Sequence, residues 1–343
     1  MDFMPKPLVA TLKKRPRRWA ITGVAGFIGS HLLEALLRHD QHVSGLDNLA
    51  AGSEANLEEV RRGVTSERWD RFRFYRGDIR DEGDCRKVCT DVDIVLHHAA
   101  TVSVPLSIEQ PHETMEINVG GFVNMMKAVR DLGVKRCVYA SSSAVYGDDP
   151  HLPKVEDQIG RPLSPYAQSK LENEESAELF AHLFKTEVVG LRYFNVFGPR
   201  QNPNGPYAGV IPQWITAMMR GKQIYINGDG STTRDFCHVD NVVQANLCAG
   251  IVDQPKALAQ VYNIAVGTST TLNELFLAIQ NALASDIPEV RSVVPRYRDF
   301  RPGDIRHSHA DISKAARLLN YEPHRMVVDG IAGTVRWYRE IPR

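Results

Sequence analysis

The sequence predicts an α/β fold, in which a doubly wound parallel (Rossmann) sheet is joined to a smaller α/β carboxyl-terminal domain. Two observations support this prediction. Short buried strands alternate with helical segments through the first half of the chain, and a glycine-rich turn separates the first strand from the first helix. Repeated strand–helix units favour parallel strands, and ligands bind such sheets beyond the carboxyl ends of the strands.

The first strand–helix–strand unit begins with a strand over 18–22. The glycine run 23–29 follows at once, and helical periodicity over 30–37 leads to a second strand over 41–46. Asp47 closes that strand. Strand, glycine turn, helix, strand and acid together are the context that a dinucleotide-binding fingerprint requires.

The three glycines of the run have separate roles in this motif. Gly23 permits the tight turn, Gly26 lets the backbone approach a pyrophosphate, and Gly29 allows close helix–strand packing. Asp47, 24 residues after Gly23, is placed to bind the adenosine ribose hydroxyls. Asn48 follows without an arginine for a 2′-phosphate. The sequence therefore predicts NAD rather than NADP as cofactor.

The rest of the sheet is predicted from later buried runs. Strands are expected over 73–78, 93–100, 136–143 and 188–193, with a helix over 118–132. The residues at their carboxyl ends are expected to face a ligand; they include Asp78, Ala99, Ala100 and Ser142. After 193 a stretch rich in Pro, Gly and Asn is typical of a folded binding loop.

Tyr166 and Lys170 form the main candidate for acid–base chemistry. Pro165 suits a helix start, and a spacing of four places the phenol and the ammonium on one helix face. An adjacent cation favours the phenolate and lowers the pKa of a tyrosine, which could then accept a hydroxyl proton. Alone, the pair could equally be a surface helix contact.

Composition excludes several other classes of function. The 343 residues are 43% hydrophobic, which is enough for a substantial core, and the formal net charge of zero predicts no nucleic-acid or membrane partner. The basic run 13–18 is expected to be a solvated lead-in, with polyanion binding as the alternative. Five scattered cysteines predict neither disulfides nor a metal site. With no signal peptide and no apolar run of about 18 residues, we expect a cytoplasmic protein.

Several longer motifs resemble the extended short-chain dehydrogenase/reductases of the nucleotide-sugar epimerase branch. These are the glycine run, Ser142, the Tyr166–Lys170 pair and the segment 192–198, Arg-Tyr-Phe-Asn-Val-Phe-Gly. Blocks at 225–230, 233–237 and 303–308 are similar to those of bacterial UDP-N-acetylglucosamine 4-epimerases. The resemblance implies tightly bound NAD, a homodimer formed through two helices of each subunit, and C4 epimerisation of a UDP-hexose through a 4-keto intermediate.

The resemblance also implies residue roles. Tyr166 would exchange the 4-hydroxyl proton, Lys170 would lower the tyrosine pKa and hold the nicotinamide ribose, and Ser142 would hydrogen-bond O4. Ser143 is the second choice, and either serine could instead cap the strand end. The implied NAD-binding residues are Gly23, Gly26, Phe27, Ile28, Gly29, Asp47, Asn48, Asp78, Ile79, Ala99, Ala100, Thr101, Tyr166, Lys170 and Tyr193. The implied UDP-sugar-binding residues are Ser103, Ser142, Ser143, Asn195, Val210, Tyr225, Asn227, Arg234, Arg301, Asp304 and Ser308.

The domains follow from the same resemblance. An NAD-binding domain is expected over 17–191 plus 232–266, a UDP-sugar-binding domain over 192–231 plus 267–343, and an amino-terminal extension over 1–16. For Tyr225 a packing role on an edge strand is the alternative to a contact with uracil.

Three features bear on the reaction and the sugar. Related dehydratases carry an acid two residues after the catalytic serine, where this chain has Ala144, so simple epimerisation is favoured. Ser308 matches the family's gate beside the sugar C2 substituent, and its small size predicts UDP-GlcNAc and UDP-GalNAc as substrates. Capping of the following helix is the alternative role of Ser308.

The chain departs from its relatives at Val102, Leu106 and Gly209, where they usually have Gly, Arg and Ala. These departures keep UDP-Glc/UDP-Gal and a uronic acid (UDP-glucuronate or UDP-GlcNAc-uronate) open as substrates. A net oxidoreductase and a noncatalytic NAD-sensing protein on the same fold are the alternatives from other classes.

Overall fold

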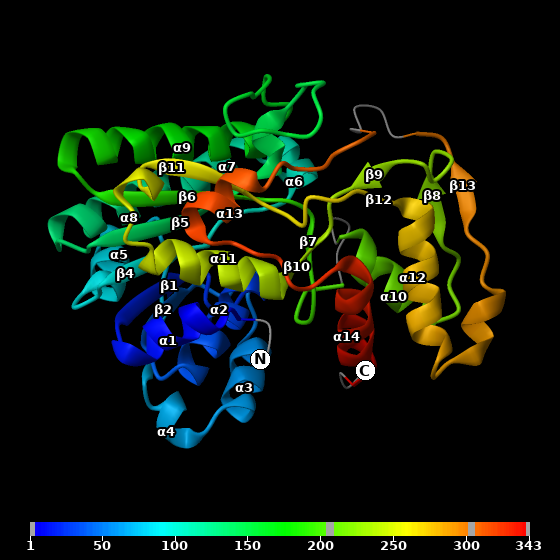
Figure 1. The fold of residues 1–343 in the computed structure, drawn as a ribbon, viewed down its shortest axis with the longest axis horizontal. Helices are drawn as coiled ribbons and strands as arrows, with labels where there is room; N and C mark the ends of the chain where they lie inside the picture. The colour runs from blue at the N-terminus through cyan, green and yellow to red at the C-terminus, as the bar shows by residue number, and fades with distance from the viewer. Residues whose placement is uncertain (1–3, 204–208, 301–305, 341–343) are drawn as a thin grey trace.

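A seven-stranded parallel sheet forms the centre of the molecule (Figure 1). The computed structural model describes residues 4–203, 209–300 and 306–340. In sheet order the strands are β11 (Gln260–Ile264), β6 (Glu187–Tyr193), β5 (Arg136–Ser142), β4 (Ile94–His97), β1 (Arg18–Thr22), β2 (His42–Asp47) and β3 (Phe72–Arg76). The order reverses between β1 and β4, which is the switch point of a doubly wound sheet. The predicted fold class is confirmed.

Helices cover both faces of the sheet. One face packs against α2 (Phe27–Arg38), α11 (Val239–Ile251), α13 (Ser313–Leu319) and the amino-terminal α1 (Lys6–Lys14). The other face packs against α5 (Glu82–Cys89), α8 (Gly121–Asp131) and α9 (Pro165–Phe184). The helices α3 (Glu54–Gly63) and α4 (Ser66–Trp69) connect β2 to β3. Within the described residues, no helix has the length and apolarity that crossing a bilayer requires.

The segment predicted as an amino-terminal extension is seated on this core. In α1 the side chains of Leu8 and Leu12 are buried against the helices below the sheet, while Lys13 and Lys14 are exposed. The Gln41 amide donates to the Leu12 carbonyl oxygen at 3.1 Å. The basic run therefore begins in the last turn of α1, a helix that apolar packing holds on the core.

A second cluster of helices and short strands lies beside the sheet domain, on the right in Figure 1. Its core holds α10 (Val210–Met219), α12 (Leu272–Ala284) and α14 (Val327–Glu340). Three two-stranded sheets accompany them: β7 (Val196–Phe197) with β10 (Cys237–His238), β8 (Tyr225–Asn227) with β13 (Arg296–Arg298), and β9 (Thr233–Arg234) with β12 (Thr270–Thr271). The predicted boundary assigns α13 to this domain, yet Ala315 and Leu319 pack in the sheet core.

A buried charge cluster joins the two domains. Arg200 lies in the chain after β6. Its guanidinium pairs with Glu34 of α2 and, at 2.8 Å, with Glu59 of α3. The Trp337 indole N–H of α14 donates to the same Glu59 carboxylate at 3.0 Å. Residues of the substrate-side domain are thus held to the helices that flank the dinucleotide turn.

The remaining helical segments are short. They are α6 (Val104–Glu109), α7 (Pro111–Met115), η1 (Glu116–Gly120), η2 (Ser143–Tyr146), η3 (Pro255–Ala257) and η4 (Pro288–Ser292). The helix predicted over 118–132 therefore starts as a π-helical turn, η1, and becomes α-helical only at Gly121. Single π turns occur frequently at functional sites.

Candidate active site

Helix α9 places Tyr166 and Lys170 at the carboxyl ends of the central strands. The Ser164 hydroxyl caps the helix by accepting from the Ala167 N–H at 3.1 Å, and Pro165 occupies the first turn. Both Tyr166 and Lys170 are buried, and the Lys170 Nζ donates to the Ala140 carbonyl oxygen of β5 at 3.1 Å. The same Nζ lies 6.0 Å from the centroid of the Tyr166 ring.

Ser142 is the serine that contacts Tyr166. It ends β5 and caps η2, and its Oγ accepts from the Ala144 N–H at 3.1 Å. Its hydroxyl also hydrogen-bonds to the Tyr166 hydroxyl. The strand-capping role and the contact with the phenol therefore coexist in one residue, and Ser143 lies one step further along η2.

The environment of the phenol differs from the one expected. Burial raises the pKa of Tyr166, and the hydrogen bond from Ser142 only partly opposes that rise. Burial likewise lowers the pKa of Lys170 to about 8, with Glu174 acting in the opposite direction. Lys170 was predicted to lower the pKa of Tyr166, but in these surroundings the pKa is raised, because burial is the larger effect.

The glycine turn has the shape of a dinucleotide cradle. Gly23 has φ +70°, and a Cβ there would lie 2.9 Å from the Ala99 nitrogen. A Cβ on Gly29 would lie 2.0 Å from the Gly23 carbonyl oxygen. Phe27 and Ile28 follow as the first residues of α2, at a helix amino terminus that favours phosphate. The residues present therefore fit NAD.

The acidic residues at the ends of β2 and β3 meet beside this turn. Asp47 is buried and accepts from the Ala25 N–H at 2.9 Å and the Leu49 N–H at 2.8 Å. The Asn48 amide donates to Asp78 at 2.9 Å, while hydrogen bonds from Arg80 hold the pKa of Asp78 at about 2. Ile79 is buried and faces Gly121 of α8, where a Cβ would lie 2.5 Å from the Ile79 side chain.

Three small residues, Ala99, Ala100 and Thr101, follow shortly after β4. The Ala99 N–H donates to the Thr22 hydroxyl at 3.1 Å, and Ala100 follows it. The Thr101 backbone is held on both sides by one amide, since Asn118 Oδ1 accepts its N–H at 2.8 Å and Asn118 Nδ2 donates to its carbonyl at 2.9 Å. Asn118 also donates to Ser169 at 3.0 Å, so η1 ties this segment to α9.

Tyr193, the last residue of β6, contacts the segment that follows β4. Its hydroxyl lies 2.8 Å from His98 Nε2 and accepts from the Asn246 amide at 2.8 Å, and the His98 ring stacks on its own ring at 6.0 Å. The contacts of His98, Asn118 and Asn246 were not predicted. No periodic pattern indicates these contacts, because each depends on a partner more than 15 residues away.

Some of the predicted substrate residues are brought together around β9. Arg234 lies in β9, and its guanidinium donates to the Thr233 carbonyl at 2.9 Å. The Ser308 N–H donates to the same carbonyl at 3.2 Å. Ser308 does not cap a helix: α13 begins at Ser313, whose N–H is accepted by Asp311 at 2.7 Å. The helix-capping alternative for Ser308 is therefore wrong.

Other predicted residues lie around the approach to Tyr166. Ser103 caps α6 by accepting from the Leu106 N–H at 3.1 Å, and Ser107 of that helix accepts the Tyr166 N–H at 3.1 Å. Asn195 donates to the Asp235 carbonyl at 3.2 Å, and Val210 begins α10. Arg301 and Asp304 lie outside the described residues.

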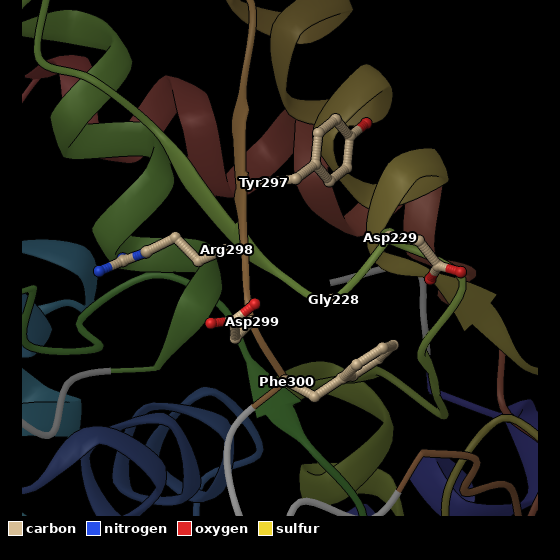
Figure 2. Close-up of a pocket in the computed structure, with 6 residues that line it drawn as sticks. All are labelled: Gly228, Asp229, Tyr297, Arg298, Asp299 and Phe300. Atoms are coloured by element: carbon tan, nitrogen blue, oxygen red, sulfur yellow. The ribbon is translucent and has the colours of Figure 1, made fainter.

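Tyr225 and Asn227 lie on β8, beside an open pocket of about 460 Å³. Figure 2 shows Tyr297, Asp229 and Phe300 around Gly228, with Arg298 on the other side of the strand. The Arg298 guanidinium lies 4.0 Å from the centroid of the Tyr225 ring. Tyr225 is 41% exposed, so packing into the core does not account for it.

Comparison with known proteins gives consistent results. Residues 19–265 match the model of the NAD dependent epimerase/dehydratase family. A UDP-glucose 4-epimerase of Mycolicibacterium smegmatis is 36% identical over 326 residues, covering 94% of this chain and 98% of that protein.

Two solved structures are similar along nearly the whole chain. A UDP-N-acetylglucosamine 4-epimerase from Methanobrevibacter ruminantium M1, in complex with UDP-N-acetylmuramic acid, has a TM-score of 0.86 at 36% identity and covers 95% of this chain and 99% of its own. A UDP-glucuronic acid 4-epimerase from Bacillus cereus, in complex with UDP-glucuronic acid and NAD, has a TM-score of 0.83 at 29% identity and covers 94% and 99%.

Proposed function

This chain belongs to the NAD dependent epimerase/dehydratase family, and we propose that it interconverts UDP-GlcNAc and UDP-GalNAc. It is an NAD-dependent UDP-sugar 4-epimerase, like relatives and structural neighbours that align along almost its entire length. The sugar is the proposed part, because the relatives are named for glucose, N-acetylglucosamine and glucuronate alike.

The proposed chemistry assigns a role to each member of the catalytic set. The glycine turn 23–29 and Asp47 would hold NAD, which would supply a hydride acceptor for C4 of the sugar and a hydride donor for the return to the opposite face. Tyr166 accepts the 4-hydroxyl proton in the first half and returns it in the second. The Ser142 hydroxyl, already hydrogen-bonded to the phenol, orients O4. Lys170 places a positive charge behind the phenol, where it favours the phenolate form that can accept the proton.

The position two residues after Ser142 supports epimerisation rather than dehydration. It is Ala144, whose methyl group can neither donate nor accept a proton, and whose N–H bonds back to the Ser142 Oγ. A site with Tyr166 alone as acid–base group can move one proton out and back. It offers no separate acid at that position to expel a 6-hydroxyl group.

The observation that carries the choice of sugar is the setting of Ser308. Its backbone is fixed to Thr233 next to Arg234, the residue proposed to bind the pyrophosphate, and its side chain is not used as a helix cap. A short side chain at that point leaves room for a C2 acetamido group. A uronic acid is the second candidate, because Val102, which is 68% exposed, replaces the glycine that is usual in relatives.

The direct test follows product formation by NMR. Purified protein without added NAD or NADPH is incubated separately with UDP-GlcNAc, UDP-Glc and UDP-glucuronate. We expect UDP-GalNAc to appear, without accumulation of NADH and without a need for stoichiometric NAD or NADPH. Turnover of the uronate alone would replace the proposed substrate, and no turnover of any sugar would favour a noncatalytic role.

Replacing Ser308 by tyrosine is expected to abolish turnover of UDP-GlcNAc while UDP-Gal turnover survives. A bulky ring in place of a hydroxymethyl group would occupy the space needed by the acetamido group in both orientations of the keto sugar. The ratio of the two kcat/KM values is the measurement. Ser66→Tyr makes the same exchange on exposed α4 and should leave the ratio unchanged. Equal loss of both activities in Ser308→Tyr would refute the size argument.

We further propose that the chain is a homodimer formed through α8 and α9. Apolar side chains on the outer faces of these helices are 39–56% exposed, which is unusual for a surface with no partner; they are Val123, Leu179, Leu183 and Phe184. Sedimentation equilibrium should give twice the monomer mass at micromolar concentration. Leu179→Glu together with Leu183→Glu should give a monomer, and a monomeric parent protein would contradict the proposal.

A further inference from the structure

A buried ion pair lies directly behind the catalytic set. Glu174 of α9 and Arg192 of β6 face each other in a two-point contact, with Arg192 Nε donating to Oε1 at 2.9 Å and Nη2 donating to Oε2 at 2.7 Å. The Ser141 hydroxyl of β5 also donates to Glu174 Oε1. Each of the two charged side chains is less than a tenth exposed. The carboxylate is therefore fixed by three donors from two neighbouring strands.

The ion pair is connected to Lys170 in two ways. Glu174 follows Lys170 by four residues, so both side chains project from one face of α9 toward the sheet. They also contact consecutive residues of β5, since Lys170 donates to the Ala140 carbonyl and Glu174 accepts from Ser141. Ser142, the next residue of the strand, holds the phenol.

Glu174 is the anionic group among the charged and titratable groups that act on Lys170. His97, the last residue of β4, and His98, which follows it, face Lys170, and burial keeps both neutral by lowering their pKa values to about 3 and about 4. From α9, the Tyr166 ring faces it, with its centroid 6.0 Å from the Lys170 Nζ. Burial disfavours the charged lysine, and Glu174 opposes that effect. Arg192, on the neighbouring strand β6, pairs with Glu174, and its positive charge partly offsets the field of the carboxylate at Lys170.

We propose that Glu174 is a positioning residue for the epimerisation, whose carboxylate, fixed by Arg192 and Ser141, keeps Lys170 charged behind Tyr166. This inference rests on the proposed catalytic role of Lys170. The Glu174–Arg192 pair would then be more than a structural crosslink, because the two partners act on Lys170 with opposite sign. A purely structural pair has no such asymmetry.

The opposite signs give the test, which is the pH profile of kcat at saturating UDP-sugar. Lys170 is charged below its pKa and loses its charge as pH rises, so its titration sets the alkaline limb. Glu174→Gln removes the anion and should move that limb down by about one pH unit or more. Arg192→Gln frees the carboxylate and should leave the limb in place or move it up. Glu174→Asp keeps the charge and should stay close to the parent.

Stability provides the matched readout. Glu174→Gln and Arg192→Gln break the same ion pair, so both should lower the thermal unfolding midpoint. If the two variants also move the alkaline limb in the same direction, the pair is structural and the inference is wrong. If Glu174→Gln does not fold, the double variant with Arg192→Gln leaves no unpaired buried charge. Its limb should then lie below that of the Arg192→Gln single variant, and equal limbs would overturn the inference.

The failure of this inference can be told apart from failure of the proposed function. If Lys170→Met keeps parental turnover, the catalytic set itself is wrong. If Lys170→Met is inactive and the limbs do not separate, only the role of Glu174 is wrong.

Discussion

Replacing Tyr166 by phenylalanine is expected to lower turnover of the UDP-sugar by about 10²–10⁴-fold, the usual contribution of a positioned acid–base group. The variant removes one oxygen atom from a buried ring and leaves the packing of α9 intact. Because Tyr166 is not among the residues proposed to bind UDP, the dissociation constant of the nucleotide sugar should change little. The measurement is kcat from product NMR, with affinity from calorimetry.

Ser142 and Ser143 supply the matched controls. Ser142→Ala loses the hydroxyl that bonds to the phenol and should be impaired, whereas Ser143→Ala, one residue further into η2, should be impaired less. Near-parental turnover in Tyr166→Phe would show that another group moves the proton.

Replacing Gly29 by alanine is expected to destabilise the protein and to weaken its hold on NAD. The added methyl carbon would lie 2.0 Å from the Gly23 carbonyl oxygen and 2.8 Å from the Gly23 carbonyl carbon, both backbone atoms. The turn and α2 must then move apart, and overpacking of this kind costs about 1–3 kcal/mol. The parent should release NAD on denaturation, and Gly29→Ala should release much less per subunit.

Gly333 in α14 is the control for this substitution. It is also a helical glycine, but a Cβ there meets no atom within 4 Å. Gly333→Ala should raise stability by about 0.5–1 kcal/mol, because alanine is the better helix former, and should leave NAD content unchanged. If Gly29→Ala retained parental stability and NAD, close packing at the turn would not be what requires glycine there.

The fold could be predicted from the sequence because its signals are local. The strand preceding Gly23 and the strand ending at Asp47 were predicted to within one residue, since an apolar run bounded by turn residues sits directly in the chain. The fold class, the family and NAD as cofactor are confirmed by the structure and its relatives. The roles of the individual site residues stay predictions.

The parts that could not be predicted depend on contacts between distant segments. No periodic pattern reveals that Asn118 lies within a π turn and holds Thr101, or that Arg192 pairs with Glu174. The shift of the Tyr166 pKa was expected with the wrong sign, because the helix spacing shows that Lys170 is close but not how deeply the phenol is buried. A local sequence pattern shows which residues are close along a helix, whereas the burial of a side chain depends on the whole fold.

The Arg200 cluster sets a limit on breathing motions of the molecule. A hinge opening that pulled Arg200 away from Glu34 and Glu59 would break two ion pairs of a guanidinium that is buried when the domains are together, so the cluster favours the closed arrangement. We therefore expect entry and release of the nucleotide sugar to use rearrangements smaller than a separation of the domains.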